Sequence, residues 1–138
     1  MNREIKFRGK KVMTGEWIFG SLVITRFKDD PKLKYYIALF LGNYSFDWEV
    51  IPESVGQFTG LYDKNGKEIY EGDVIKVHSD HTYIAPVVFN QDKCSFQLAH
   101  KKGYHGAWGI TRNTIGTCDY EIIGNIYENP ELIVSEDL

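Results

Sequence analysis

Histidine and carboxylate side chains that could bind a metal ion lie close together in one short polar segment. His78, Asp80 and His81 supply two imidazoles and a carboxylate, a donor set that suits a divalent ion such as zinc. Because no regular motif aligns the two rings, we favour a solvated polar turn as the interpretation of this segment. A second set of potential ligands lacks the closely spaced pairs of a zinc knuckle or ribbon: Cys94, His100, His105 and Cys118. The sequence therefore predicts no metal site and no other cofactor.

Motifs for covalent or acid and base catalysis are not recognisable in the chain. It has no glycine-flanked serine elbow and no cysteine-protease signature, and its glycines do not have the spacing of a phosphate-binding loop. Glu71 and Asp73 could transfer protons if they faced one cleft, but they lie where a turn is expected, and capping of that turn explains them. We therefore predict that the protein is not an enzyme.

Basic residues beside aromatic residues indicate another chemistry, in which cations follow phosphates and rings stack on bases. One basic cluster opens the chain, a second precedes Tyr35 and Tyr36, and a third brackets aromatic residues after residue 100. The candidate contact residues, for nucleic acid or for a protein partner, are Lys6, Arg8, Lys10, Lys11, Lys101, Lys102, Tyr104, Trp108 and Arg112. The chain as a whole has a net charge of -3, so nucleic-acid binding ranks below protein binding.

Charge is unevenly distributed along the chain. Residues 1–34 carry nine Lys and Arg against four Asp and Glu, whereas residues 35–138 carry seven against fifteen. The basic head and the acidic body are compatible with an interaction surface, with two halves of one fold that complement each other, or with contacts between subunits. We favour a structural role of the charge over an interaction surface, and the sequence leaves open whether that role lies within one subunit or between subunits.

The elements that must position these side chains are predicted to be strands. The 138 residues are enough for one domain with a real core, and an aromatic content of 14% with thirteen Gly and four Pro favours pleated strands and tight turns. No long apolar run and no signal sequence are present, so we expect no membrane contact, a cytoplasmic protein, and Cys94 and Cys118 as thiols.

Period-two alternation and turn residues locate the individual strands. Asn65 and Gly66 predict a tight type I′ hairpin, Gly72 permits a sharp turn that Asp73 can cap, and residues 101–116 are predicted to form a long loop or an irregular hairpin. A short helix is predicted to begin at Asn129 and Pro130. The predicted strands are residues 4–9, 16–27, 34–41, 44–51, 71–77, 83–90, 94–100 and 120–128, of which 34–41 is predicted to be a core strand.

Three blocks of sequence resemble the YopX family. They are REIKFR at residues 3–8, VGQFTGLYDKNGKEIYEGDVI at residues 55–75 and YEIIGNIYENPEL at residues 120–132. The resemblance implies a phage or prophage origin and a mostly β fold, with a small SH3-like barrel plus additional N-terminal strands and at most one or two short helices. It also implies a homo-oligomer, but supplies no catalytic residues.

On this basis we predict a single YopX-like domain over residues 1–138, with N-terminal strands and the basic head in 1–54 and the barrel region in 55–138. The predicted function is a non-enzymatic phage or prophage accessory protein that binds a host or phage protein in the bacterial cytoplasm. A nucleic-acid-binding β barrel is the alternative, and a metal-binding or enzymatic protein ranks third.

Overall fold

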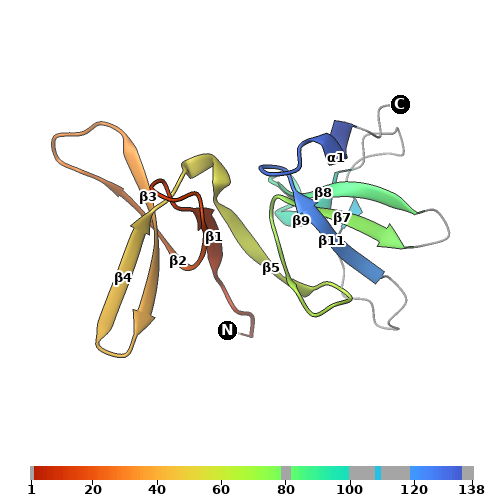
Figure 1. Ribbon diagram of the computed structural model, residues 1–138, viewed down its shortest axis with the longest axis horizontal. Coiled ribbons are helices and arrows are strands. Elements are labelled where there is room, and N and C mark those ends of the chain that lie inside the picture. Colours follow the sequence, from red (N-terminus) through yellow and green to blue (C-terminus); the bar gives the residue numbers. More distant parts are fainter. Residues whose placement is uncertain (1, 79–81, 100–107, 110–118, 135–138) are drawn as a thin grey trace. The chain divides into compact units, whose positions relative to one another are not determined.

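The structure is a computed structural model that describes residues 2–78, 82–99, 108–109 and 119–134. It divides into two compact units, Met1–Phe58 and Thr59–Leu138 (Figure 1). Both units consist of antiparallel strands, which confirms the predicted mostly β class. The structure divides the chain four residues later than the predicted boundary after residue 54, and the single domain over residues 1–138 stays a prediction.

The first unit is an antiparallel sheet in the order β4-β3-β2-β1-β5. Figure 1 shows β2, β3 and β4 side by side as a meander. A 3-10 turn at Pro52–Ser54 leads from β4 to β5, and β5 continues into the second unit. The strands are β1 (Phe7–Lys10), β2 (Trp17–Arg26), β3 (Leu33–Leu41), β4 (Tyr44–Glu49) and β5 (Gly56–Tyr62).

The two faces of this sheet follow from the register, because paired residues on antiparallel strands lie on the same face. Gly9 pairs with Ile18, Leu22 with Ile37, and Ile37 with Trp48, and we call this side the core face. Its buried cluster is Ile18, Ile37 and Val50, packed with Phe7, Leu22, Tyr35, Leu39, Trp48 and Val55. We call the opposite side the outer face; it carries Arg8, Lys10, Trp17, Phe19, Val23, Tyr36 and Phe40.

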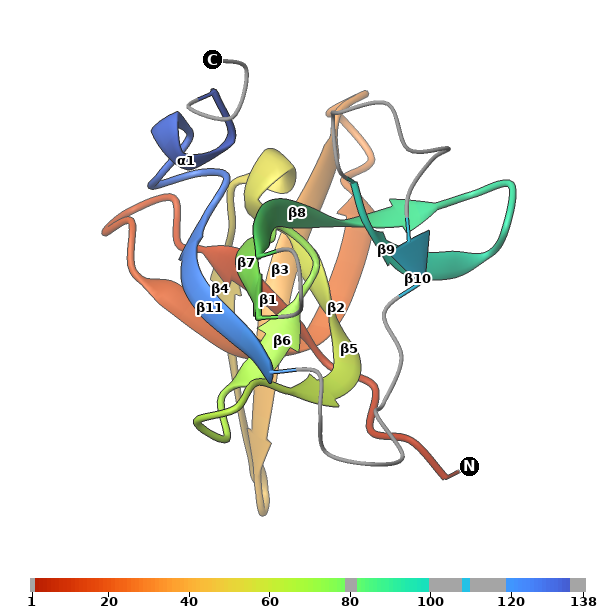
Figure 2. The same cartoon turned by 90° about the vertical axis from the view of Figure 1, so that its right-hand side faces the viewer.

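The second unit is a sheet in the order β10-β9-β8-β7-β11, and β11 runs alongside β7 (Figure 2). Its core is Ile69, Ile75, Val77, Ala85, Val87 and Leu98. Strand β6 adjoins β5. The SH3-like barrel stays a prediction. The elements are β6 (Glu68–Tyr70), β7 (Asp73–His78), β8 (Tyr83–Asn90), β9 (Ser95–Leu98), β10 (Trp108–Gly109), β11 (Asp119–Asn125) and the predicted short helix α1 (Glu131–Val134).

Strand β8 changes partner at its proline. Tyr83 to Pro86 pair with β7, and Val87 to Asn90 pair with β9. A proline has no N–H to donate to a ladder, so it is tolerated where one pairing ends and the next begins. Pro86 stands at that junction.

The predicted hairpin between β5 and β6 is confirmed, but its predicted turn type is wrong. Gly66 has φ +80°, whereas Asn65 is not among the described residues with positive φ. A type I′ turn needs positive φ at both central residues. The Gly66 N–H donates to the carbonyl of Asp63 at 3.0 Å, and the Asp63 N–H donates to the carbonyl of Lys67 at 2.7 Å. This is a three-residue loop whose last position, rather than its Asn-Gly pair, requires the left-handed conformation.

The turn into β7 matches its prediction. Gly72 has φ +92°, and a Cβ there would lie 2.9 Å from the ring of Tyr127. Asp73 is 2% exposed, and its Oδ2 accepts a hydrogen bond from the N–H of Tyr70 at 2.8 Å. The carboxylate therefore caps the turn, as the sequence predicts.

Candidate interaction surface

The basic cluster at the start of the chain does not form one charged patch. Strand alternation places Lys6, Arg8 and Lys10 on the outer face and Lys11 on the core face, where Lys11 forms a bridge with Val50. The sequence correctly predicts a strand here, but an unbroken run of cations in sequence is divided between two faces in space.

Each of these four cations lies over an aromatic ring. The Arg8 guanidinium lies 4.6 Å from the ring centre of Trp17, and the Lys10 ammonium lies 5.5 Å from the same ring. Lys6 lies over Phe58 at 5.1 Å, and Lys11 lies over Trp48 at 4.8 Å. These distances are within the range of cation–π attraction, so the cationic groups hold strands of their own unit together.

Acidic neighbours offset part of the same charge. Lys6 forms an ion pair with Glu4 at 3.2 Å, and Lys11 forms one with Glu16 at 3.6 Å. Arg8 is only 7% exposed. A buried guanidinium stacked on indole is poorly placed to reach a phosphate of an external nucleic acid. Together these contacts favour a structural role for the basic cluster at residues 6–11.

Large apolar side chains are exposed on the outer face instead. Phe19 is 45% exposed, Val23 is 42% exposed and Phe40 is 68% exposed. The register puts the three on one side of β2 and β3. Phe40 and Leu41 belong to a segment predicted to be a core strand; Ile37 and Ala38 are buried there, but Phe40 and Leu41 are not. The end of this strand is therefore surface, contrary to that prediction.

The core face also reaches the surface, at the distal end of β3 and β4. Leu41, Tyr44 and Phe46 are 62%, 72% and 47% exposed. The ring of Phe46 stacks on that of Trp48 with a centroid distance of 6.0 Å and an interplanar angle of 23°. An aromatic row thus runs along β4 from the buried cluster to the surface.

The third basic cluster, after residue 100, lies mostly outside the described residues. The predicted contacts Lys101, Lys102, Tyr104 and Arg112 are among the residues that are not described. Trp108 lies in β10, where its backbone pairs with Leu98. The predicted contacts after residue 100 therefore stay predictions, and the pairing of β10 with β9 adds a strand pair to the segment predicted as a loop or irregular hairpin.

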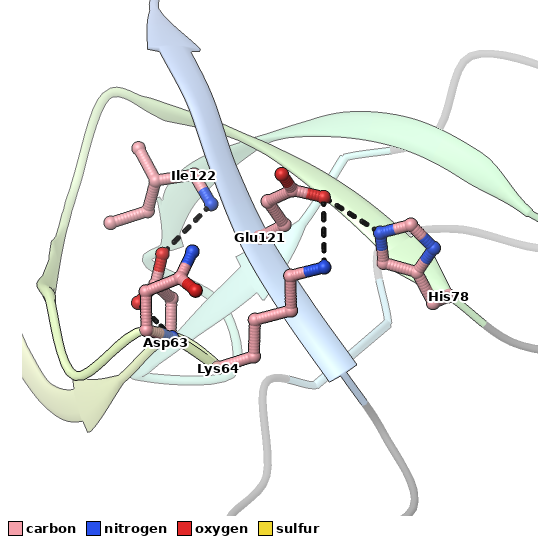
Figure 3. A network of polar contacts seen from close by, with 6 residues as sticks. Asp63, Lys64, His78, Glu121 and Ile122 are labelled. Atoms are coloured by element: carbon pink, nitrogen blue, oxygen red, sulfur yellow. Dashed lines mark hydrogen bonds and ion pairs between the residues drawn. The ribbon is translucent and has the colours of Figure 1, made fainter.

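A polar network joins the β5–β6 turn to β11 in the second unit (Figure 3). Glu121 Oε2 lies 2.8 Å from His78 Nε2 and 3.3 Å from Lys64 Nζ. The hydrogen bond from His78, followed by that from Lys64, lowers the pKa of Glu121 below its ordinary value of 4.5. The Glu121 carboxylate therefore contacts two side chains that can carry a positive charge, and all three side chains are partly exposed to solvent.

This network accounts for the described part of the predicted metal ligands. The ring of His78 faces Glu121, while Asp80 and His81 lie outside the described residues. Cys94 is an exposed thiol with φ +50° in the turn after β8, and its proposed companions His100, His105 and Cys118 are likewise not described. Among the residues that are described, no three His, Cys, Asp or Glu side chains gather as a metal-binding group.

These features define a small, two-unit, all-β protein, and among its described residues most of the exposed large apolar side chains lie on the first unit. The chain belongs to the YopX family, whose model, described as YopX protein, matches residues 6–134. The crystal structure of protein EF1440 from Enterococcus faecalis is similar to it, with a TM-score of 0.56 and 21% sequence identity over 96% of this chain and 99% of that chain. At this identity the likeness shows the fold alone. Curated proteins offered no match.

The part of the chain that the structure describes has no helix long and apolar enough to cross a membrane.

Proposed function

We propose that this YopX family protein is a non-enzymatic accessory protein of phage or prophage origin that binds a host or phage protein in the bacterial cytoplasm. The binding element is the N-terminal unit. One observation carries the proposal: of the fifteen large apolar side chains that are exposed in the described residues, thirteen lie between Ile5 and Ile51, and the others are Tyr62 and Phe89 in the second unit.

The exposed apolar residues are not needed for the core of their own unit. That core is already formed by the cluster around Ile18, Ile37 and Val50. Burial of each apolar Å² is worth roughly 25 cal/mol, so the exposed Phe, Leu and Tyr side chains on this small sheet would stabilise a complex with a partner that covers them. Large exposed apolar patches on soluble domains commonly mark protein-binding sites.

Charge supports a protein partner over a nucleic acid. The four cations of the cluster at the start of the chain, Lys6, Arg8, Lys10 and Lys11, are engaged with rings of the same unit, and two of them also with its carboxylates. Affinity for nucleic acid depends on cations that can replace the counterions of phosphates. The outer face carries one further cation near Val23, Lys34 on β3. Its ammonium forms an ion pair with Glu49 at 3.8 Å and lies over the ring of Phe27 at 5.8 Å, so it too is engaged within its own unit.

The test is affinity purification of the tagged protein from phage-infected bacteria, with and without nuclease. We expect a protein partner that remains after nuclease treatment and is lost from a Val23→Glu, Phe40→Glu double variant. The control is Phe89→Glu, which adds one carboxylate, half the charge of the double variant, at a side chain 41% exposed in the second unit and should retain the partner.

Two results would count against the proposal. One is recovery of nucleic acid alone, or of partners that disappear with nuclease, which would favour the alternative of nucleic-acid binding. The other is equal capture by the wild type and the double variant, after thermal unfolding has shown that both are folded. That result would show that the partner does not bind through the outer face.

A further inference from the structure

We propose that the free edge of β4 pairs with β4 of a second copy of this chain, antiparallel and centred on Phe46, so that two N-terminal sheets become one. This inference goes beyond the proposed function, which uses the outer face of the sheet and not its edge. Among the described strands, β4 lies at one end of its sheet and β6 at the other.

The hydrogen-bonding groups of this edge can be assigned from the contacts at the end of the strand. The N–H of Val50 donates to the carbonyl of Tyr35 on β3, whereas the carbonyl of Glu49 accepts from Val12 on the opposite side. Because backbone groups alternate in direction along a strand, Ser45 and Asp47 direct their N–H and C=O groups away from β3, as Glu49 does. Residues 45 and 47 therefore present a ready template for another strand.

Apart from two carboxylates and the contact of Val12 with Glu49, the edge lacks the usual devices that prevent such pairing. Natural edge strands are protected by Pro, by Lys, by bulges or by short length. Strand β4 spans six residues, Tyr44–Glu49, contains no Pro and no Lys, and pairs with β3 without a shift in register. Its only charges are the carboxylates of Asp47 and Glu49.

Those carboxylates also select the register. With the two-fold axis at Phe46, Tyr44 faces Trp48 of the second copy, and Ser45 faces Asp47. With the axis at Asp47, two carboxylates would face each other directly, and like charges in opposed positions destabilise a strand pair. A shift by a single residue would place aromatic side chains opposite polar ones.

The side chains along β4 are self-complementary in the favoured register. Tyr44, Phe46 and Trp48 lie on the core face and alternate with polar residues on the outer face. Pairing would join two aromatic rows into one and cover Tyr44 and Phe46, which are now 72% and 47% exposed. An isologous two-fold contact of this kind needs only one patch on each copy. This match of the strand to itself identifies a second copy as the occupant.

The outer faces remain available in such a dimer, because strands pair edge to edge. Phe19, Val23 and Phe40 of each copy would lie on one side of a sheet twice as wide. An edge contact alone is small beside the standard interface of about 800 Å² per partner. We therefore expect a reversible dimer whose population falls on dilution.

The first experiment is sedimentation velocity over a dilution series of the full chain. The wild type should dimerise, and Phe46→Lys should be monomeric, because it places two ammonium groups opposite each other on the axis. Phe40→Lys is the matched control, since Phe40 is 68% exposed on the adjacent strand but on the outer face; it should still dimerise. A dimer that persists in Phe46→Lys would overturn the proposal.

Cysteine cross-linking then tests the register, in a background of Cys94→Ser and Cys118→Ser. With oxidised glutathione, Phe46→Cys should form a disulfide with itself, because opposed Cβ atoms in a strand pair lie about 4.5–5.5 Å apart. Asp47→Cys should not. Cross-linking of Asp47→Cys instead would overturn the register. A wild type that is monomeric at every concentration, yet captures a partner through the outer face, would overturn the dimer while leaving the proposed function standing.

Discussion

The carboxylate of Asp63 accepts a hydrogen bond at 3.2 Å from the backbone N–H of Ile122, 59 residues further along the chain. Its other oxygen accepts from the N–H groups of Asn65 and Lys67 at 2.8 and 2.9 Å. One buried side chain thus shapes the β5–β6 turn and attaches that turn to β11. A second bond reinforces the attachment, because the N–H of Lys64 donates to the carbonyl of Tyr120 at 2.8 Å.

We expect Asp63→Ala to lower the free energy of unfolding by about 3 kcal/mol, because three N–H groups lose a charged acceptor at a buried position. Equilibrium denaturation in urea measures this change. The matched control is Asp92→Ala in the exposed turn after β8, which should change stability by less than about 0.5 kcal/mol. Equal effects of the two substitutions would show that the Asp63 contacts do not stabilise the fold.

Gly66→Val should destabilise by about 1–2 kcal/mol, the cost of the left-handed conformation for a residue with a Cβ, since nothing lies within 4 Å of the position that a Cβ would occupy. Gly66→Asn should restore most of the loss, because Asn tolerates this conformation. Urea denaturation of both variants checks the order. If the Asn variant were as unstable as the Val variant, backbone strain at residue 66 would not be the cause.

Gly72→Val should be more damaging than Gly66→Val, because steric conflict with the Tyr127 ring is added to the same strain. We expect about 3 kcal/mol in total. A double-mutant cycle with Tyr127→Ala measures the steric part. The cost of Gly72→Val should be smaller in the Tyr127→Ala background, and an unchanged cost would assign the whole effect to the backbone.

The comparison with the sequence shows which of these features local patterns can predict. Alternation in residues 16–27 predicts a strand that the structure places at Trp17–Arg26, and Gly72 and Asp73 predict their turn correctly. The turn at Gly66 is predicted in place but not in type, since Asn-Gly is compatible with several hairpin loops. Local sequence patterns thus predict the bounds of these strands to within about three residues: the strand predicted at 4–9 is Phe7–Lys10, and the one predicted at 120–128 is Asp119–Asn125.

Local sequence patterns do not predict contacts between residues that are far apart in the chain, or which apolar residues are exposed. Nothing near Asp63 in sequence indicates that its carboxylate meets Ile122. The sequence also does not predict that Phe40 and Leu41 are exposed, because an apolar residue has the same local pattern whether its own core or a partner covers it. Strand β10 has only two residues, which are too few to show an alternating pattern in the sequence. The signal that could have indicated an exposed edge is the alternation of aromatic and polar residues in YSFDWE at 44–49, with no protecting Lys or Pro.

The lowered pKa of Glu121 predicts a stability difference that depends on pH. A carboxyl whose pKa is lower in the folded state stabilises the protein above its ordinary value, here 4.5, and this contribution is lost as pH falls through the lowered pKa. Glu121→Gln should therefore be less stable than the wild type well above pH 4.5 and equal to it in strong acid. Denaturation of both proteins across this range is the measurement.

The partners of Glu121 provide the control for that prediction. In a His78→Leu, Lys64→Met background the carboxylate loses both groups that lower its pKa, so Glu121→Gln should then produce little pH-dependent difference. If the difference persisted unchanged in that background, its origin would lie outside the network of Figure 3.

The contact between Arg8 and Trp17 predicts a structural rather than a binding role for the most buried cation of the basic head. A cation–π pair removed from water is worth about 2 kcal/mol, and an exposed one about 0.5–1 kcal/mol. Arg8 is 7% exposed and 4.6 Å from the ring, whereas Lys10 is half-buried and 5.5 Å from it. In double-mutant cycles with Trp17→Leu, we expect Arg8→Met to show the larger coupling and Lys10→Met the smaller.

Binding of labelled single-stranded DNA at low salt separates the two roles, because phosphate contacts would make affinity depend steeply on salt. Arg8→Met should lower the denaturant midpoint and leave any weak DNA binding unchanged. The opposite pattern, wild-type stability with lost and salt-dependent binding, would mean that Arg8 contacts phosphates and that the indole merely holds the guanidinium in place for them. The double-mutant cycles and the DNA-binding measurements therefore show whether the pair Arg8 and Trp17 stabilises the contact between two strands or binds nucleic acid.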